Sequence, residues 1–371
     1  MIAKLMTQMT PAQITAALEA GIITQEQADN MTRANSPRAR SDIDNHEEVT
    51  IGNEEDLRFI RGFSDIFITI GLGLLLLGLS TITGLSGSGG LFLIAAAIVY
   101  AMAEYFGRKK RAHLPTLIIT IAFLSFMFIG VGSLISELGG FNNVGGAVLT
   151  AFIMLIAMVG YYARIRLPFC IAIITYLSLS LIVTLLMLVM KDFVLSNAGA
   201  FMILAGLITL ALGIFYDSKD QHRTTRFSDN AFWLHLTAAP LLIHGAVFTL
   251  LGGASLTKGW FIPNSNVGEG HAIMILLFVG IMTCLGLILN RRALIVSSLL
   301  YALIAVGYLL FKIGINGTMA LTLTLILIGA AITLLGVGWH PVRNIMIRAL
   351  PQNRYIPAPY DPSLKTKMGV K

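Results

Sequence analysis

The sequence predicts an all-α fold: a polytopic bundle of about ten transmembrane helices behind a small cytoplasmic helical hairpin. Three observations predict it. Apolar residues make up 56% of the 371 residues and charged residues only 12%, roughly half the charged share of a soluble domain. Ten apolar stretches follow one another, each close to the roughly 20 residues that cross a bilayer. The charges between them alternate as a fixed membrane orientation requires.

The ten stretches are separated by short polar turns. Each is long enough to satisfy its backbone hydrogen bonds internally while it crosses lipid. The expected spans are Ser64–Leu85, Leu91–Phe106, Pro115–Ile135, Val144–Tyr162, Pro168–Met190, Ala198–Tyr216, Ala231–Gly252, Ala272–Leu289, Ala293–Phe311 and Thr318–Trp339.

The positions of the basic residues indicate that both termini face the cytoplasm. With the N-terminus inside, the turns after the even-numbered spans lie inside and contain eleven bases: 108–111, 164, 166, 219, 223, 226, 291 and 292. The opposite turns contain three, at 191, 258 and 312. This is the positive-inside bias, so the net charge of +7 reflects membrane topology and not nucleic-acid binding.

Residues 1–35 read as a cytoplasmic helical hairpin. Two capping boxes, Thr10–Gln13 and Thr24–Gln27, open its two helices. The apolar seam is too small to be stable alone, so we expect it to dock on the membrane domain or on a protein partner. Its members are Ile14, Leu18, Ile22 and Met31.

Three further regions complete the predicted organisation. Residues 36–56 form an acidic linker whose composition is typical of disorder. Residues 57–340 form the bundle, and 341–371 form a basic amphipathic helix followed by a Pro-rich tail. In the helix we expect the apolar residues to lie on the anionic inner leaflet and the arginines to point away from it. The apolar residues are Val342, Ile345 and Met346, and the arginines are Arg343 and Arg348.

The seventh span carries the strongest candidate site. It contains His235, Thr237, Pro240 and His244. Pro240 has no N–H for the carbonyl four residues earlier, which predicts a kink. Thr237 and His244 share a face near the bilayer midplane, and His235 lies on the opposite face. A polar residue at this depth indicates a solute site, and packing against a neighbouring helix is an equal alternative.

Glu104 is a second candidate, one turn before the basic turn at Arg108. It could belong to an ion path through the membrane. Pairing with Arg108, four residues on, costs less than burying a carboxylate, so we favour an interfacial ion pair.

Small residues recur along three spans and predict close helix packing. They are Gly199, Gly206 and Gly213 in the sixth span, Gly71 and Gly78 in the first, and Gly329 and Gly336 in the tenth.

The sequence predicts no catalytic residue, no metal site and no cofactor. It lacks GxSxG, HExxH, P-loop and CxxC motifs. The two histidines of the seventh span lie on opposite faces, which disfavours a metal site. Cys170 and Cys284 both lie inside apolar stretches, so a disulfide framework is not expected.

Two short segments resemble bacterial membrane proteins. Leu18–Ala28 carries Gly21, Ile23, Glu26, Gln27 and Ala28, and resembles the GxIxxEQA hairpin that precedes the spans in a group of uncharacterised polytopic inner-membrane proteins. Residues 231–241 resemble a recurrent stretch in such proteins. The resemblance implies an inner-membrane location and brings no activity or functional residues with it.

Three functions remain open from the sequence. Ten spans and the polar seventh helix favour a permease-like protein for a small solute. The hairpin and the near-absence of a polar core favour a non-enzymatic scaffold that binds a partner through residues 1–35. An intramembrane enzyme ranks third, because no nucleophile–base pair is present.

Overall fold

The computed structural model describes residues 11–20, 24, 25, 27, 28, 63–139, 144–220, 225–250, 268–348 and 350. The chain divides into two compact units, one of residues 1–54, 222–224 and 360–371, the other of residues 55–221 and 225–359. The predicted linker 36–56 and the Pro-rich tail lie outside the described residues.

In the first unit, helix α2 spans Pro11–Glu19. Ile14 of the predicted apolar seam is buried, as is Ala28. Thr24 and Gln27 form the reciprocal hydrogen bonds of the predicted capping box: the Gln27 backbone N–H donates to Thr24 Oγ1 at 3.3 Å, and the Thr24 N–H donates to Gln27 Oε1 at 2.9 Å. Ile22 and Met31, the other half of the seam, are not described.

The second unit is a bundle of long helices, and the described part of the chain contains no strand. Among the described residues, ten helices are long and apolar enough to cross a membrane, which confirms the all-α polytopic fold. Their bounds are α5 Phe63–Ser86, α6 Gly89–Ala103 continued by the π-helix η1 Glu104–Lys109, α7 His113–Glu137, α8 Val144–Ile165, α9 Phe169–Ser196, α10 Ala198–Lys219, α11 Arg226–Leu250, α12 Glu269–Leu289, α13 Ala293–Lys312 and α14 Gly317–Val337.

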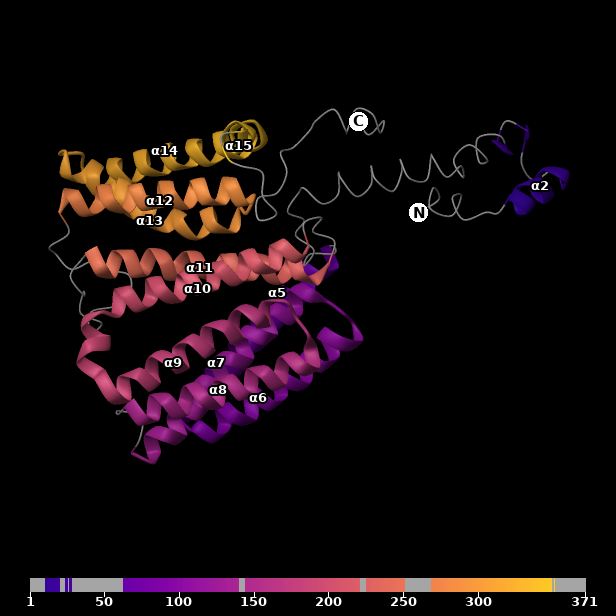
Figure 1. Cartoon of the computed structure of the whole chain (residues 1–371). Helices are drawn as coiled ribbons and strands as arrows, with labels where there is room; N and C mark the ends of the chain where they lie inside the picture. Colours follow the sequence, from indigo (N-terminus) through magenta and orange to yellow (C-terminus); the bar gives the residue numbers. More distant parts are fainter. Residues whose placement is uncertain are drawn as a thin grey trace. The chain divides into compact units, whose positions relative to one another are not determined.

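The bundle has two helix groups (Figure 1). In the first, α5–α8 and the start of α9 pack around Val99, Ile119 and Met158. In the second, α10–α13 pack around Leu242, Met282 and Leu294. Helix α9 contacts α8 of one group and α10 and α11 of the other. It is therefore the element through which the two groups meet.

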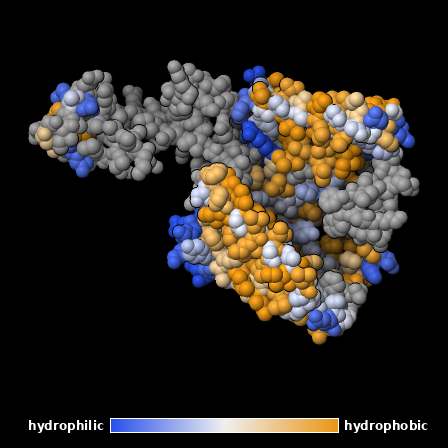
Figure 2. Space-filling model, turned by 180° about the vertical axis from the view of Figure 1, so that it is seen from behind, coloured by the Kyte–Doolittle hydropathy of each residue, from blue (hydrophilic) through white to orange (hydrophobic). Residues whose placement is uncertain are grey.

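Much of the bundle surface is apolar, as lipid contact requires. Phe67 is 70% exposed, and Val189 and Val337 are each 83% exposed. Figure 2 shows this apolar surface as two lobes with a hollow between them. Burying such side chains in hydrocarbon removes them from water without any protein partner.

Helix α9 contains a break that the sequence did not predict. Met190 has φ −138° and ψ 57°, outside the helical region, so the last turns of α9 leave the direction of the rest. Helix α11, in contrast, runs as one element from Arg226 to Leu250 with Pro240 inside it.

The predicted glycine stripes divide into one that packs and two that do not. A Cβ on Gly206 would lie 2.7 Å from Leu242 Cγ of α11, and one on Gly213 would lie 2.9 Å from the His235 ring. At Gly199 a Cβ would meet Thr249 of α11. The stripe of α10 therefore allows the α10 and α11 backbones to approach closely. In α5 and α14, Cβ atoms at Gly71, Gly78, Gly329 and Gly336 would meet nothing within 4 Å.

The short helix α15, Trp339–Arg348, buries one of the two arginines that we expected to lie away from its membrane-facing residues. Arg343 is 1% exposed, whereas Ile345 is 69% exposed. Arg343 therefore does not point to water. The helix begins two residues earlier than predicted, and Trp339 and Ile347, four residues to either side of Arg343, turn that face inward. Val342 and Ile345 stay on the exposed face, where a membrane surface could receive them.

The packing of α10 against α11 predicts that Gly206→Ala lowers the thermal unfolding temperature of the purified protein in detergent. The new methyl group would meet Leu242 Cγ at 2.7 Å and the Leu242 backbone N at 2.9 Å, so a backbone has to move, at a cost of about 1–3 kcal/mol. Gly78→Ala is the matched control and should leave the temperature unchanged or raise it, because alanine favours helix. Equal losses in both variants would contradict the packing role.

Candidate functional site

Helix α11 carries four of the five predicted site residues, and the structure distributes them over different neighbours. His244 faces α13, and His235 faces α10. This agrees with the prediction that the two histidines lie on opposite faces. Glu104, the fifth, lies in η1, where it contacts Arg108 and Arg164 and none of the α11 residues named above. The five predicted residues therefore do not form one site.

His244 forms a polar pair with Tyr301 of α13. The Tyr301 hydroxyl lies 2.5 Å from His244 Nδ1, and their ring centroids are 5.1 Å apart, edge to face. Both side chains are half-buried. Their surroundings are apolar, because Tyr301 and Val247, three residues after His244, pack against the buried cluster of Ala272, Ile275 and Ala305. The pair is thus a polar contact within the otherwise apolar interface between α11 and α13.

The protonation of His244 decides how the pair is bonded. His244 Nδ1 also lies 2.9 Å from the carbonyl oxygen of Pro240. A carbonyl only accepts, so this contact requires a proton on Nδ1. In the other tautomer, Nδ1 accepts from the Tyr301 hydroxyl instead. The pair can therefore exchange donor and acceptor roles without any net charge.

The remaining residues on this side of α11 are used within the helix. The Thr237 hydroxyl donates to the Trp233 carbonyl at 2.9 Å, and Pro240 supplies the carbonyl next to His244. Trp233 in turn packs against Phe169 of α9, with ring centroids 4.8 Å apart. Of the predicted face, His244 is the residue that reaches a side chain on another helix.

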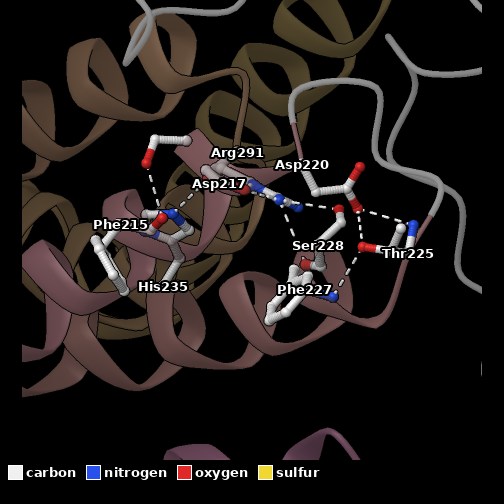
Figure 3. A network of polar contacts seen from close by, with 9 residues as sticks. Phe215, Asp217, Asp220, Thr225, Phe227, Ser228, His235 and Arg291 are labelled. Atoms are coloured by element: carbon white, nitrogen blue, oxygen red, sulfur yellow. Dashed lines mark hydrogen bonds and ion pairs between the residues drawn. The ribbon is translucent and has the colours of Figure 1, made fainter.

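His235 is fully buried against α10 (Figure 3). Its Nε2 lies 2.8 Å from Asp217 Oδ2, and Gly213, one turn before Asp217, gives the ring room. Because an ionised carboxylate only accepts, Nε2 donates in this bond. A packed imidazole with a carboxylate partner accounts for a polar residue that the sequence alone could not assign.

Arg291, in the turn between α12 and α13, completes a buried charged cluster with Asp217, His235 and Ser228 (Figure 3). Its Nε donates to Asp217 Oδ2 at 3.1 Å, and its Nη2 donates to Asp217 Oδ1. Nη2 also lies 3.2 Å from Ser228 Oγ of α11. The arginine is 1% exposed, so its charge depends on this two-point contact with the carboxylate.

Helix α15 also contacts the turn between α12 and α13 and the end of α12. Asn290, in the left-handed conformation with φ 53°, accepts from Trp339 Nε1 at 2.8 Å. Arg343 Nε donates to the Leu287 carbonyl at 3.1 Å, at the C-terminal end of α12, where a cation complements the helix dipole. Burial lowers the pKa of the Arg343 guanidinium to about 10, so it stays charged at neutral pH.

Asp220 holds the segment that leads into α11 (Figure 3). Its Oδ2 accepts from the Thr225 backbone N–H at 2.8 Å and from the Thr225 hydroxyl at 2.6 Å. Asp217 thus bonds to Arg291, and Asp220 bonds to Thr225.

Glu104 lies at the start of η1 and joins two turns. Arg108 Nη1 donates to its Oε2 at 3.0 Å, which is the predicted pair. Arg164 Nε, at the end of α8, donates to its Oε1 at 2.5 Å. All three side chains are partly exposed, so the bridge is a surface ion pair of small energetic value. This geometry favours the interfacial role of Glu104 over an ion path.

Sequence reasoning missed three residues of these contacts: Tyr301, Asp217 and Arg291. Asp217 lies just beyond the predicted end of its span, and Arg291 is one of the eleven bases assigned to the inner turns. One signal was available, since Asp217 follows Gly213 by one turn on the stripe that faces α11. The partner of that carboxylate, 74 residues away, could not be read from spacing.

Among the described residues, no group of three or more histidine, cysteine, aspartate or glutamate side chains is arranged to hold a metal ion. No protein-family model, no curated protein and no solved structure matches the chain. The functional assignment therefore rests on two groups of contacts made by α11, the His244–Tyr301 pair and the cluster of His235, Asp217 and Arg291.

The cluster predicts that Arg291→Met destabilises the protein by about 3–5 kcal/mol, because it leaves Asp217 buried without its main countercharge. Adding Asp217→Leu in the same chain should recover part of this loss, since no buried charge then remains. The measurement is thermal unfolding in detergent for both single variants and the double variant.

Arg292→Met is the matched control. Arg292 is exposed and stacks on the Trp339 ring at 5.2 Å, a contact worth about 0.5–1 kcal/mol at an exposed site. If the Arg291 and Arg292 variants lost stability equally, the buried pair would have no special part in the fold.

Proposed function

We propose that this chain is a permease-like protein of the bacterial inner membrane that moves a small neutral polar solute without converting it chemically. The observation that carries the proposal is the His244–Tyr301 pair, half-buried in the apolar interface between α11 and α13. Imidazole and phenol both donate and accept hydrogen bonds. Such a pair suits hydroxyl or amide groups and offers no fixed charge for an ion.

The distribution of charge on α11 supports this assignment. Asp217 of α10 and Arg291 of the α12–α13 turn lie beside the start of α11, near Ser228, and neutralise each other there. We assign that cluster a structural role: it ties α10, α11 and the α12–α13 turn together. The centre of α11 then carries polarity without net charge, which agrees with solute movement that is not driven by a coupled ion.

The packing of α9 supports movement between the two helix groups. Helix α9 has 28 residues, of which Cys170, Ala172 and Val194 are buried. A loosely packed element between two firmly packed groups leaves them able to shift relative to each other. Transporters alternate their access in this way, by rocking one bundle against another.

The proposed orientation places both termini in the cytoplasm. The turns that carry Glu104, Arg108 and Arg164 meet at one end of the bundle, and so do those that carry Asp217 and Arg291. All these turns belong to the side on which the basic excess gathers. The inner-membrane location follows from this bias together with the resemblance of Leu18–Ala28.

A scaffold function is the alternative, with residues 1–35 as the binding element for a protein partner. It is favoured by the capping box at Thr24 and Gln27, which shows helical order in a unit separate from the bundle. A capped helical segment with a small core is typical of an element that gains stability from a partner.

Transport is tested in proteoliposomes with a panel of glycerol, urea, glucose and alanine, followed by stopped-flow light scattering. We expect at least one solute to cross about tenfold faster than in protein-free liposomes. His244→Ala and Tyr301→Phe should each slow it, by at least the factor of about ten that a lost hydrogen bond of about 1.4 kcal/mol represents. Thr333→Val, on the exposed face of α14, should not.

Two results would reject the permease proposal. One is that no panel solute crosses faster than in empty liposomes. The other is that His244→Ala transports at the wild-type rate. The scaffold alternative predicts this second result, together with loss of a crosslinked partner when residues 1–35 are deleted from the full chain.

The orientation predicts which single cysteines a membrane-impermeant maleimide reaches in intact cells, in a chain with Cys170→Ala and Cys284→Ala. Lys191→Cys and Lys312→Cys should react from outside, whereas Lys110→Cys should react only after lysis. All three positions are exposed in the structure, so burial does not confuse the readout. Labelling of Lys110→Cys in intact cells would reverse the orientation.

A further inference from the structure

The turns that follow α6 and α8 form a basic patch that the solute site does not use. We define the basic patch as Arg108, Lys109, Lys110, Arg111, Arg164 and Arg166, all of them exposed. Figure 2 shows a hydrophilic area on the left side of the lower lobe of the bundle, directly beside the apolar surface of that lobe.

Glu104 brings the two halves of the patch together. Its Oε2 accepts from Arg108 and its Oε1 from Arg164, so both carboxylate oxygens are engaged. Arginines that are distant in sequence thus lie within one carboxylate of each other. Six bases against this one acid leave the patch with an excess of five positive charges.

Local backbone geometry presents the bases outward. The wide turn of η1 places Arg108 and Lys109 in its last turn, and π-helical turns are rare and often functional. Arg111 and Arg166 both adopt the left-handed conformation, with φ 54° and 56°. Each ends its helix there and begins the next within a few residues, so the basic side chains stay at the end of the bundle.

The surface beside the patch is one that acyl chains would cover. Tyr105, 44% exposed, lies beneath Lys109, whose Nζ is 5.8 Å from the ring centroid. Farther along the same helices, Ile98 on α6 and Val159 on α8 are each 48% exposed. A ligand that satisfies both regions has an anionic head and an apolar tail.

We propose that the basic patch is a binding site for the phosphate headgroup of an acidic phospholipid, whose acyl chains lie along α6 and α8. The bases supply the charge, and the depth of the patch, at the end of an apolar surface, selects a lipid over a soluble polyanion. The site does not depend on His244 or on transport.

The test is lipid binding by the full chain in nanodiscs and by native mass spectrometry, with phosphatidylglycerol and cardiolipin against phosphatidylcholine. The variant is Lys109→Gln/Lys110→Gln/Arg166→Gln, which leaves the Glu104 bridge intact. Each base near an anionic surface contributes about 1 kcal/mol, or roughly fivefold. We therefore expect binding of the acidic lipids to weaken on the order of 100-fold, with phosphatidylcholine unaffected.

The control variant Lys191→Gln/Lys219→Gln/Lys312→Gln removes the same number of charges elsewhere. It includes Lys219, which also lies over an aromatic ring, that of Phe215 at 4.2 Å. The control should bind acidic lipid as the wild type does. In the wild-type protein, raising NaCl from 50 to 500 mM should weaken the binding, because the patch is exposed and screened.

Three outcomes would overturn the proposal. The patch variant could bind acidic lipid like the wild type, or the control variant could lose as much affinity as the patch variant. Inorganic phosphate at millimolar concentration could displace the lipid completely, which would make the patch a free-phosphate site. A transport defect in the His244 variants has no bearing on any of these results.

Discussion

The second helix group depends on one ion pair, between Asp217 and Arg291. It joins the end of α10 to the α12–α13 turn, and through Ser228 and His235 it also holds α11. A charge in this position is costly unless its partner is fixed. The glycine stripe fixes it, since Gly213 admits His235, and His235 occupies the remaining side of the carboxylate. Close helix packing and charge neutralisation are therefore one arrangement.

Hydrophobic length made the fold predictable. A span must satisfy its own backbone in lipid, so ten apolar stretches of sufficient length correspond to ten helices in the described part of the chain. Their bounds lie within three residues of the prediction, except that α9 ends six residues later and α11 begins five residues earlier. Local pairs were also predictable, such as Glu104 with Arg108, because a helix places residues four apart on one face. The glycine stripe of α10 was predicted as a packing surface, but the same pattern in α5 and α14 has no neighbour.

Contacts between distant segments were not predictable. Arg164 joins Glu104 from 60 residues away, and Tyr301 joins His244 from 57. Sequence spacing within a helix carries no information on such pairs. The burial of Arg343 was unpredictable for a related reason: an amphipathic pattern shows which residues share a face, but not which distant segment covers the opposite face.

The separation of Asp217 and Arg291 has a consequence for synthesis. Their 74 residues take about 4–15 seconds to translate at about 5–20 residues per second. Helix α11, Arg226–Leu250, is made within that interval, so His235 is available to Asp217 before Arg291 has been synthesised. Because Asp217 lies in the last turn of α10, its carboxylate can remain at the level of the lipid headgroups until Arg291 is present. Translation order alone therefore makes α10 and α11 available to each other before the α12–α13 turn can supply Arg291.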